Sequence, residues 1–537
     1  MVRTLTKSWP LLLGIPFLQA QNSEVWVADK GNGTYGNPIL YADYSDPDVI
    51  RVGEDYYMTA SSFTAVPGLP ILHSRDLVNW RLVNHALQEI TPNDVFERPQ
   101  HGKGVWAPSI RYHKDQYYIF WGDPDYGIYR VRAKDPMGPW EAPVLVKQGK
   151  GLIDPSPLWD EDGQAYLVHA YAGSRAGVKS LLVLHRMDPG ATQVLDKGKV
   201  IFDGHDAHPT VEGPKFHKSS GYYYIFAPAG GVATGWQLVL RSKDIFGPYQ
   251  EKVTLEQGST STNGPHQGAW VDAPDGTDWF VHFQDVGAYG RIVHLQPMQW
   301  HGDWPQMGRD LDGNGIGEPV SSHRKPVGGQ ALATPQESDE FDSDALGLQW
   351  QWQANPNPTW YSLIGGRGFL RLFTVKKEVG ENNLWNSPNL LLQKFPAPDF
   401  KATTLIRLWP EEAENGKSAG LIVFGLDYAT LTLAKDADGY VLRQTLALGA
   451  KDNKGEEIIE EIRVQDNAIH LQVEVKGPGA LCQFRYSIDG KRFHDMGRPF
   501  VAKEGQWVGA KVGLFSSSAA EIKYGGYVDV DYFRITK

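Results

Sequence analysis

The chain has 537 residues, more than one hydrophobic core usually serves, so two or more domains are expected. Its 58 glycines, 35 prolines and 12% aromatic residues favour many short strands joined by tight turns. The formal net charge of −11 argues against a nucleic-acid partner, because binding to phosphates needs a basic face.

Residues 1–20 form the first predicted segment of the chain. Arg3 and Lys7 make its start positive, an apolar run extends from Trp9 to Leu18, and small residues end it. This order is typical of a secretory signal peptide, and the apolar run is too short to span a bilayer. No later stretch approaches about 18 apolar residues, so we expect an exported protein, periplasmic or secreted, without a membrane span.

One sequence pattern returns five times between residues 27 and 326. Each copy is an apolar strand, a polar turn with Gly or Asp, and a second strand that opens on Tyr or Trp. The copies are "DPDVIRVGEDYYMTAS" at Asp46, "APSIRYHKDQYYIFWG" at Ala107, "DPSPLWDEDGQAYLVHA" at Asp154, "EGPKFHKSSGYYYIFA" at Glu212 and "GPHQGAWVDAPDGTDWFVHFQ" at Gly264. Three or four strands that repeat roughly every 50 to 60 residues are typical of propeller blades. Residues 27–326 are therefore predicted to form a five-bladed β-propeller.

The first strand of each blade lines the central channel of a propeller, so the first residues of the five repeats are expected to face one another. In order these are Asp46, Ala107, Asp154, Glu212 and, in the fifth repeat, His266. Carboxylates placed that close together repel by several kcal/mol unless their protonation adjusts. Because structure alone does not require such a cluster, we interpret it as a functional site.

An Asp-Pro pair has a simpler interpretation as a turn former, because Pro fixes φ and Asp caps the turn. Asp123, Asp135 and Asp188 are also followed by Pro, and they come after the aromatic strand, at the outer end of a blade. Asp46 and Asp154 differ from these by their position at the start of a repeat. Glu212 holds the same position without a neighbouring Asp-Pro pair.

Three carboxyl groups in one small space suit the hydrolysis of a glycosidic bond. That reaction needs a protonated acid beside the leaving oxygen and a charged carboxylate on the opposite face of the sugar. A third carboxylate beside the acid helps to keep it protonated and in position. The longer side chain of Glu212 favours it as the acid, which leaves Asp46 as the base and Asp154 as the modulator.

The region from about residue 37 to 326 resembles the propeller of glycoside hydrolase family 43, the β-xylosidases and α-L-arabinofuranosidases. The phrases that carry the resemblance are "NPILYADYSDPDVIRVGEDYY", "GVWAPSI", "LIDPSPLWDEDG", "VEGPKFHKSSGYYY", "NGPHQGAWVD" and "GRIVHLQP". The resemblance implies an inverting mechanism with Asp46 as general base, Asp154 as pKa modulator and Glu212 as general acid. It also implies an exo-acting enzyme that releases terminal β-D-xylose or α-L-arabinofuranose from plant cell-wall oligosaccharides.

The same resemblance assigns supporting roles to four further residues. Arg291 resembles the arginine that hydrogen-bonds sugar hydroxyls, and its forked guanidinium suits that role. Phe63 and Trp106 resemble aromatic residues that wall the pocket, although Phe63 is equally compatible with an ordinary core position. His266 resembles a hub histidine that faces a calcium ion or a water cluster in some relatives. No cofactor is expected to be required, and a structural calcium ion stays an alternative to a hydrogen bond from His266 to water.

Residues 327–337 are small and polar and are predicted to be a linker. Residues 338–537 alternate apolar and polar positions without a repeat of about 50 residues, which predicts a β-sandwich. This part resembles the concanavalin-like C-terminal domain of many family 43 xylosidases, which packs on the propeller and can close one side of the pocket. A purely stabilising role is the alternative. Cys482, the single cysteine, is predicted to be a buried apolar residue.

Two other functions fit parts of the sequence. A retaining, invertase-type five-bladed enzyme would carry Asn-Asp-Pro-Asn at its nucleophile, whereas this chain has Ser-Asp-Pro-Asp at residues 45–48. A non-catalytic sugar-binding propeller would have no use for three carboxylates in the catalytic positions. The favoured prediction is therefore an inverting glycosidase with an oligosaccharide substrate and no nucleic-acid partner.

Overall fold

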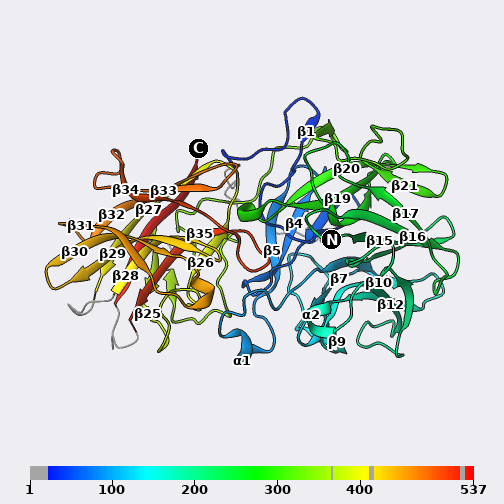
Figure 1. The fold of residues 1–537 in the computed structure, drawn as a ribbon, viewed down its shortest axis with the longest axis horizontal. Helices are drawn as coiled ribbons and strands as arrows, with labels where there is room; N and C mark the ends of the chain where they lie inside the picture. Colours follow the sequence, from blue (N-terminus) through cyan, green and yellow to red (C-terminus); the bar gives the residue numbers. More distant parts are fainter. Residues whose placement is uncertain (1–21, 364–366, 411–416, 520–525) are drawn as a thin grey trace, which may run out of the picture.

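The structure is a computed structural model that describes residues 22–363, 367–410, 417–519 and 526–537. Figure 1 shows two β-rich bodies side by side, one coloured from blue to green and the other from yellow to red. The predicted signal peptide at residues 1–20 lies outside the described residues. Within the described ranges, no helix has the length and apolar character needed to cross a membrane.

Five four-stranded antiparallel sheets form the first body, all within the described stretch 22–363, and each uses four consecutive strands. Blade 1 is β2 (Asp48–Val52), β3 (Asp55–Thr59), β4 (Gly68–Ser74) and β5 (Arg81–Leu87). Blade 2 is β6 (Ser109–His113), β7 (Gln116–Asp123), β8 (Gly127–Ala133) and β9 (Val144–Gln148), and blade 3 is β10 (Leu152–Trp159), β11 (Ala165–Tyr171), β12 (Leu181–Met187) and β13 (Lys199–Asp203). Blade 4 is β14 (Lys215–Ser219), β15 (Tyr222–Ala229), β16 (Trp236–Ser242) and β17 (Gln250–Leu255), and blade 5 is β18 (His266–Asp272), β19 (Asp278–Asp285), β20 (Arg291–His301) and β21 (Trp304–Met307). The predicted five-bladed β-propeller is confirmed.

Each blade follows from the local pattern of its repeat. In blade 1, Tyr56 and Met58 are fully buried on alternate positions of β3, as the period of two along a strand requires. Gly53 makes the turn between β2 and β3 with a φ of 66°, a conformation that a residue without a side chain adopts at little cost. Strand β2 also contacts β6 and β18, the first strands of the two neighbouring blades. The starts of the repeats therefore meet around one axis.

The N-terminal segment closes the ring of blades. Strand β1 (Thr34–Gly36) pairs with β22 (Ser322–Arg324), and the N–H of Ile39 donates to the carbonyl of Val293 in blade 5 at 2.8 Å. The Asn37 side chain accepts from the N–H of Leu295 at 2.9 Å and donates to the carbonyl of that residue at 2.8 Å. These bonds join residues more than 250 positions apart and fix blade 1 against blade 5.

Helices contribute little to the described part of the fold. The two α-helices are α1 (Asn93–Phe96) and α2 (Gly173–Ala176), and the two 3-10 turns are η1 (Gly287–Tyr289) and η2 (Ala450–Asp452). All four are shorter than one typical helix and serve as connections between strands. The chain is thus an all-β protein, as predicted.

Two packed sheets form the second body within the described residues beyond 338. One sheet has the order β23 (Tyr361–Leu363), β24 (Leu370–Phe373), β36 (Tyr527–Thr536), β27 (Phe400–Trp409), β32 (Ala468–Lys476), β33 (Leu481–Ser487) and β34 (His494–Val501). The other has the order β25 (Val375–Lys376), β35 (Lys511–Ser518), β28 (Lys417–Phe424), β29 (Tyr428–Asp436), β30 (Gly439–Ala447) and β31 (Glu457–Val464), with β26 (Leu391–Lys394) also paired to β35. The predicted β-sandwich is confirmed, and Cys482 is fully buried in its core.

The two bodies share a continuous interface. The N–H of Trp352 donates to the carbonyl of Val66 at 2.7 Å, and Val66 returns a bond of 3.1 Å. Tyr289 and Ile292 of the propeller are buried in the same hydrophobic cluster as the sandwich core. The sandwich is therefore docked on the propeller through backbone pairing and apolar burial.

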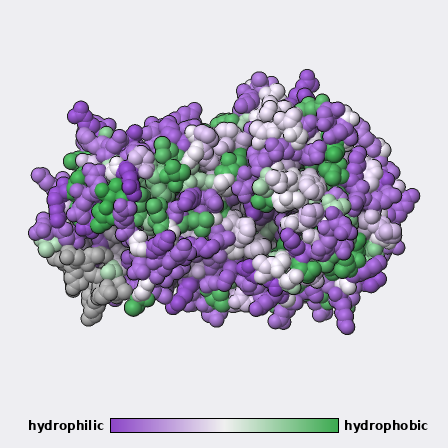
Figure 2. Space-filling model, viewed as in Figure 1, coloured by the Kyte–Doolittle hydropathy of each residue, from purple (hydrophilic) through white to green (hydrophobic). Residues whose placement is uncertain are grey.

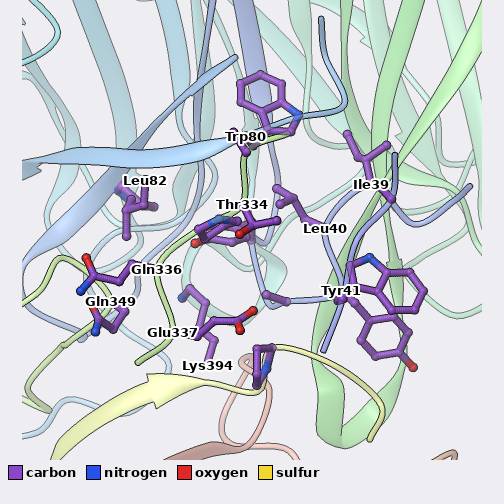
Figure 3. A pocket seen from close by; sticks show the side chains of 18 of the residues that line it. Ile39, Leu40, Tyr41, Trp80, Leu82, Thr334, Gln336, Glu337, Gln349 and Lys394 are labelled. Carbon is purple, nitrogen blue, oxygen red and sulfur yellow. The ribbon is translucent and has the colours of Figure 1, made fainter. Parts of the chain in front are cut away.

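The predicted linker runs along this interface. Figure 3 shows Thr334 and Glu337 of this segment beside Leu40 of the propeller and Lys394 of the sandwich. Burial raises the pKa of Glu337 to about 7. The outer surface of the face drawn in Figure 2 is predominantly hydrophilic, with hydrophobic residues in separate groups.

Candidate active site

The three predicted carboxylates line one cavity at the propeller hub. The cavity has a volume of about 300 Å³, and Asp46, Asp154 and Glu212 all contribute to its wall. Asp46 precedes β2, Asp154 lies at an irregularity near the start of β10, and Glu212 precedes β14. The three carboxylates that the repeat pattern predicts at the hub therefore do lie around one cavity.

Two of these carboxylates have unusual backbone conformations. Asp46 has a φ of 55° and Asp154 a φ of 56°, in the left-handed region that side chains disfavour. Such conformations cost about 1–3 kcal/mol each and occur most often at functional sites. In Asp154 the conformation coincides with a shift of register between Ile153 and Ser156, which turns this carboxylate out of the regular strand pattern.

Asp46 is surrounded by hydrogen-bond donors. Its side chain is buried, and its oxygens accept bonds from the Ser45 hydroxyl at 2.9 Å and from the Ser61 hydroxyl. Arg291 Nη1 lies 3.1 Å from Oδ1 and 3.2 Å from Oδ2 of the same carboxylate. Charged and neutral donors together stabilise the negative charge of Asp46.

Asp154 has a different environment. Its Oδ2 accepts a bond from the N–H of Gly213 at 2.8 Å, and Gln267 Nε2 lies 3.4 Å away. Burial raises the pKa of Asp154 well above its usual range, and repulsion from Glu212 and Asp46 raises it further. Burial and the negative charge of the two neighbouring carboxylates therefore both favour the protonated form of Asp154.

Glu212 is the most accessible of the three carboxylates. About 23% of its side chain is exposed, and its Oε1 lies 3.0 Å from Nε2 of His266. His266 is fully buried, and its Nδ1 has no hydrogen-bond partner within the described part of the chain. His266 is therefore not part of the cavity wall, and its ring instead contacts Glu212 from within the protein. No group of three or more His, Cys, Asp or Glu side chains in the described ranges is arranged to hold a metal ion.

Lys215 places a positive charge beneath the carboxylates. It is fully buried, and its Nζ donates to the carbonyl of Pro108 at 2.7 Å. Burial lowers the pKa of Lys215, while the nearby carboxylates of Asp48, Asp154 and Asp46 oppose that shift. This lysine was not predicted as a site residue, because "EGPKF" reads as an ordinary strand start in the sequence.

Aromatic and basic side chains form the rest of the wall. Phe63 and Trp106 both line the cavity, with ring centroids 6.4 Å apart. Phe63 also has a φ of 51° and forms a backbone bridge to Val105, so it serves both the wall and the core. Arg291, predicted to bind sugar hydroxyls, lines the cavity and directs one guanidinium nitrogen at Asp46.

Sequence reasoning missed six residues of the cavity wall, which are Ile153, Thr210, Gly231, Val232, Gln267 and Trp507. Trp507 lies in the sandwich, between β34 and β35, and its side chain lines the cavity from the second domain. The residue is 51% exposed and has a φ of 66°, which is rare for a bulky side chain. In the sequence, a Trp within the polar stretch "KEGQWVG" indicates a surface position that could bind a ligand. Nothing in the sequence connects this residue to the hub.

Comparison with known proteins identifies the family of this site. The family described as "Glycosyl hydrolases family 43" matches residues 35–305, which contain all three carboxylates. The chain belongs to glycoside hydrolase family 43. The family 43 enzyme also matches, over residues 338–536, the domain described as "Beta xylosidase C-terminal Concanavalin A-like domain".

Relatives extend over almost the whole of this family 43 enzyme. A β-xylosidase from Formosa agariphila is 33% identical over 94% of this chain and 90% of its own length. The non-reducing end α-L-arabinofuranosidase BoGH43B from Bacteroides ovatus is 31% identical over 74% of this chain and 75% of its own. The crystal structure of the GH43 protein BlXynB from Bacillus licheniformis has a TM-score of 0.80 at 25% identity and covers 94% of this chain and 99% of its own. The likeness includes the order of propeller and sandwich.

Proposed function

We propose that this family 43 glycoside hydrolase is exo-acting and inverting, and that it releases terminal β-D-xylose, α-L-arabinofuranose or both from hemicellulose oligosaccharides. The names of the two relatives support both sugars. The cavity volume of about 300 Å³ supports action on a chain end, because ligand pockets range over roughly 300–1,000 Å³ and this one suits few sugar rings.

The observation that carries the proposal is the presence of three carboxylates in one cavity, each in a different environment. Asp46 accepts hydrogen bonds from Arg291 and two serine hydroxyls, which orient its carboxylate as suits a general base that activates water. Glu212 is the carboxyl group with an exposed edge, which suits a general acid that must reach the glycosidic oxygen.

Asp154 completes this arrangement as the modulator. It is buried, and repulsion from Glu212 adds to the rise in the pKa of Asp154, so the two carboxyl groups are close enough to influence each other electrostatically. In the proposed reaction, Glu212 protonates the leaving oxygen while water, deprotonated by Asp46, attacks the anomeric carbon from the opposite face. The attack inverts that carbon.

A proton NMR time course on linear xylo-oligosaccharides mixed with arabinose-decorated ones tests the proposal. We expect xylose, arabinose or both to appear, with xylose first formed as the α-anomer. Xylose appearing first as the β-anomer would indicate retention, as in an invertase-type enzyme, and would overturn the inverting mechanism. Release of neither sugar would overturn the substrate assignment.

We further propose that the protein is exported to the periplasm or the medium. The positive start, the short apolar run and the small-residue end of residues 1–20 support this proposal. Mass spectrometry of the protein recovered from periplasmic and culture fractions should show a chain that lacks these residues. Recovery of the chain from the cytoplasm with residues 1–20 intact would overturn it.

A further inference from the structure

Asp43 lies at the seam between the two domains, three residues before Asp46. Only 5% of it is exposed, and each of its carboxylate oxygens accepts a hydrogen bond from the backbone. Oδ1 accepts from the N–H of Arg291 at 2.9 Å, and Oδ2 accepts from the N–H of Gly509 at 2.9 Å. One carboxylate therefore joins the arginine that contacts Asp46 to the sandwich loop that carries Trp507.

Glycines make this close contact possible. A side chain at Gly290 would place its Cβ 2.6 Å from Cγ of Asp43, and Gly290 has a φ of 71°. A Cβ at Gly509 would lie 2.8 Å from the backbone nitrogen of Gly290. The N–H of Ala510 also donates to the carbonyl of Ala288 at 2.7 Å. The propeller loop that leads to Arg291 is thus held between Asp43 and the sandwich.

The charges around Asp43 make a neutral replacement costly. Lys394 and Lys511 of the sandwich are close enough to interact with Asp43 electrostatically. Burial lowers the pKa of Lys511 to about 7, repulsion from Lys394 adds to this shift, and the charge of Asp43 opposes it. Asp43 therefore supplies negative charge to an interface that is otherwise rich in buried cations.

We propose that Asp43 is a positioning residue that locks the Trp507 loop over the cavity and aligns Arg291 with Asp46. This inference rests on the proposed function, because it assigns Asp43 an effect on the binding of that substrate.

The test compares Asp43→Asn, Trp507→Ala and the double variant with the unaltered enzyme on xylobiose and on an arabinose-decorated xylo-oligosaccharide. An Asn side chain keeps the shape of Asp43 but presents an amide donor to one of the two backbone N–H groups. We expect each single variant to raise KM about tenfold for the substrate that the enzyme hydrolyses. The double variant should raise KM no further than the more impaired single variant, because both changes take the Trp507 side chain away from the cavity wall.

Asp339→Asn is the matched control. Asp339 is a half-buried carboxylate in the sandwich that accepts from the N–H of Phe341 at 2.9 Å and from Trp350 Nε1 at 2.9 Å, away from the cavity. We expect it to lower stability without changing KM. If the fold-increases in KM caused by Asp43→Asn and Trp507→Ala multiply in the double variant, the proposal is overturned. An unchanged KM in Asp43→Asn would also overturn it.

A second variant covers the case in which Asp43→Asn does not fold. Gly509→Ala strains the same contact from the sandwich side, and we expect the same rise in KM and the same absence of a further effect with Trp507→Ala. An unchanged KM in Gly509→Ala would overturn the proposal.

Hydrogen exchange followed by mass spectrometry separates this inference from the proposed function. Asp43→Asn should speed exchange in the peptide that contains Gly509, whatever the substrate is. Unchanged exchange there would overturn the lock itself. If the unaltered enzyme releases neither sugar but Asp43→Asn still speeds exchange, the proposed substrate is refuted. The role of Asp43 in holding the Trp507 loop would then still stand.

Discussion

Nε2 of the buried His266 lies 3.0 Å from Oε1 of Glu212, at the inner end of a cavity that also contains Asp46 and Asp154. The histidine comes from blade 5 and the glutamate from the start of blade 4, so the closed ring of blades sets the orientation of the proposed acid. The outer part of Glu212 stays accessible to substrate. One oxygen of the Glu212 carboxyl group is thus held by His266, while the exposed part of the side chain can contact substrate.

Replacement of the proposed acid should affect substrates according to their leaving groups. In Glu212→Ala, we expect kcat on xylobiose to fall by about 10²–10⁴, because the leaving sugar then departs without a proton. Nitrophenyl xyloside, whose leaving group needs little protonation, should lose much less activity. Steady-state kinetics on both substrates measures the ratio, and equal losses would contradict the role of Glu212 as acid.

Replacement of the proposed base should affect both kinds of substrate alike. In Asp46→Ala, no group is left in the position from which water is activated, so kcat should fall by about 10³ or more on xylobiose and on nitrophenyl xyloside. Calorimetric binding of xylose serves as the control that the cavity is intact. Substantial remaining activity on either substrate would show that another group activates water.

Asp154→Asn should move the alkaline limb of the pH–kcat profile to lower pH. An acid catalyst must keep its proton as pH rises, and a carboxylate beside it favours the protonated form by repulsion. The repulsion between Asp154 and Glu212 is lost when the Asp154 carboxyl group is replaced by an amide. Asp123→Asn is the matched control, because burial raises the pKa of Asp123 to about 7 and this residue is outside the cavity wall. An unmoved limb in Asp154→Asn would contradict the modulator role.

Lys215→Met should move the same limb in the opposite direction. The positive charge of Lys215 lowers the pKa of Asp154, so its removal should let Asp154 keep its proton to a higher pH. Lys218→Met provides the control on the same strand, where Lys218 instead forms an ion pair with Asp160. A downward shift or no shift in Lys215→Met would show that this lysine does not act on the carboxylates.

The same raised pKa predicts an effect on stability. The folded pKa of Asp154 lies above its unfolded value, so the folded state binds more protons between the two values and stability falls as pH rises through that window. Asp154→Asn removes this penalty and should raise the free energy of unfolding at pH 7 by about 1–2 kcal/mol. Chemical denaturation at pH 7 and at pH 4 measures the effect. A lower stability of the variant at pH 7 would contradict it.

The sequence by itself determined the blades and the positions of the three carboxylates. Asp46, Asp154 and Glu212 open the first, third and fourth copies of a repeat, and the start of each first strand lies at the axis because every blade is built with the same local pattern. Strand alternation in the second half likewise predicted the sandwich. These features depend on residues that are near one another in the chain.

Only the tertiary structure decided which residues complete the cavity and support it. Trp507 and Asp43 are separated by more than 460 positions in the chain and are connected through the bond from Gly509 to Asp43. Lys215 lies near the carboxylates only because the closed ring brings the start of β14 against β10 and within reach of Pro108, which precedes β6. Such contacts have no periodic signature, since docking of one domain on another depends on surface shape and buried charge, which a single sequence does not display.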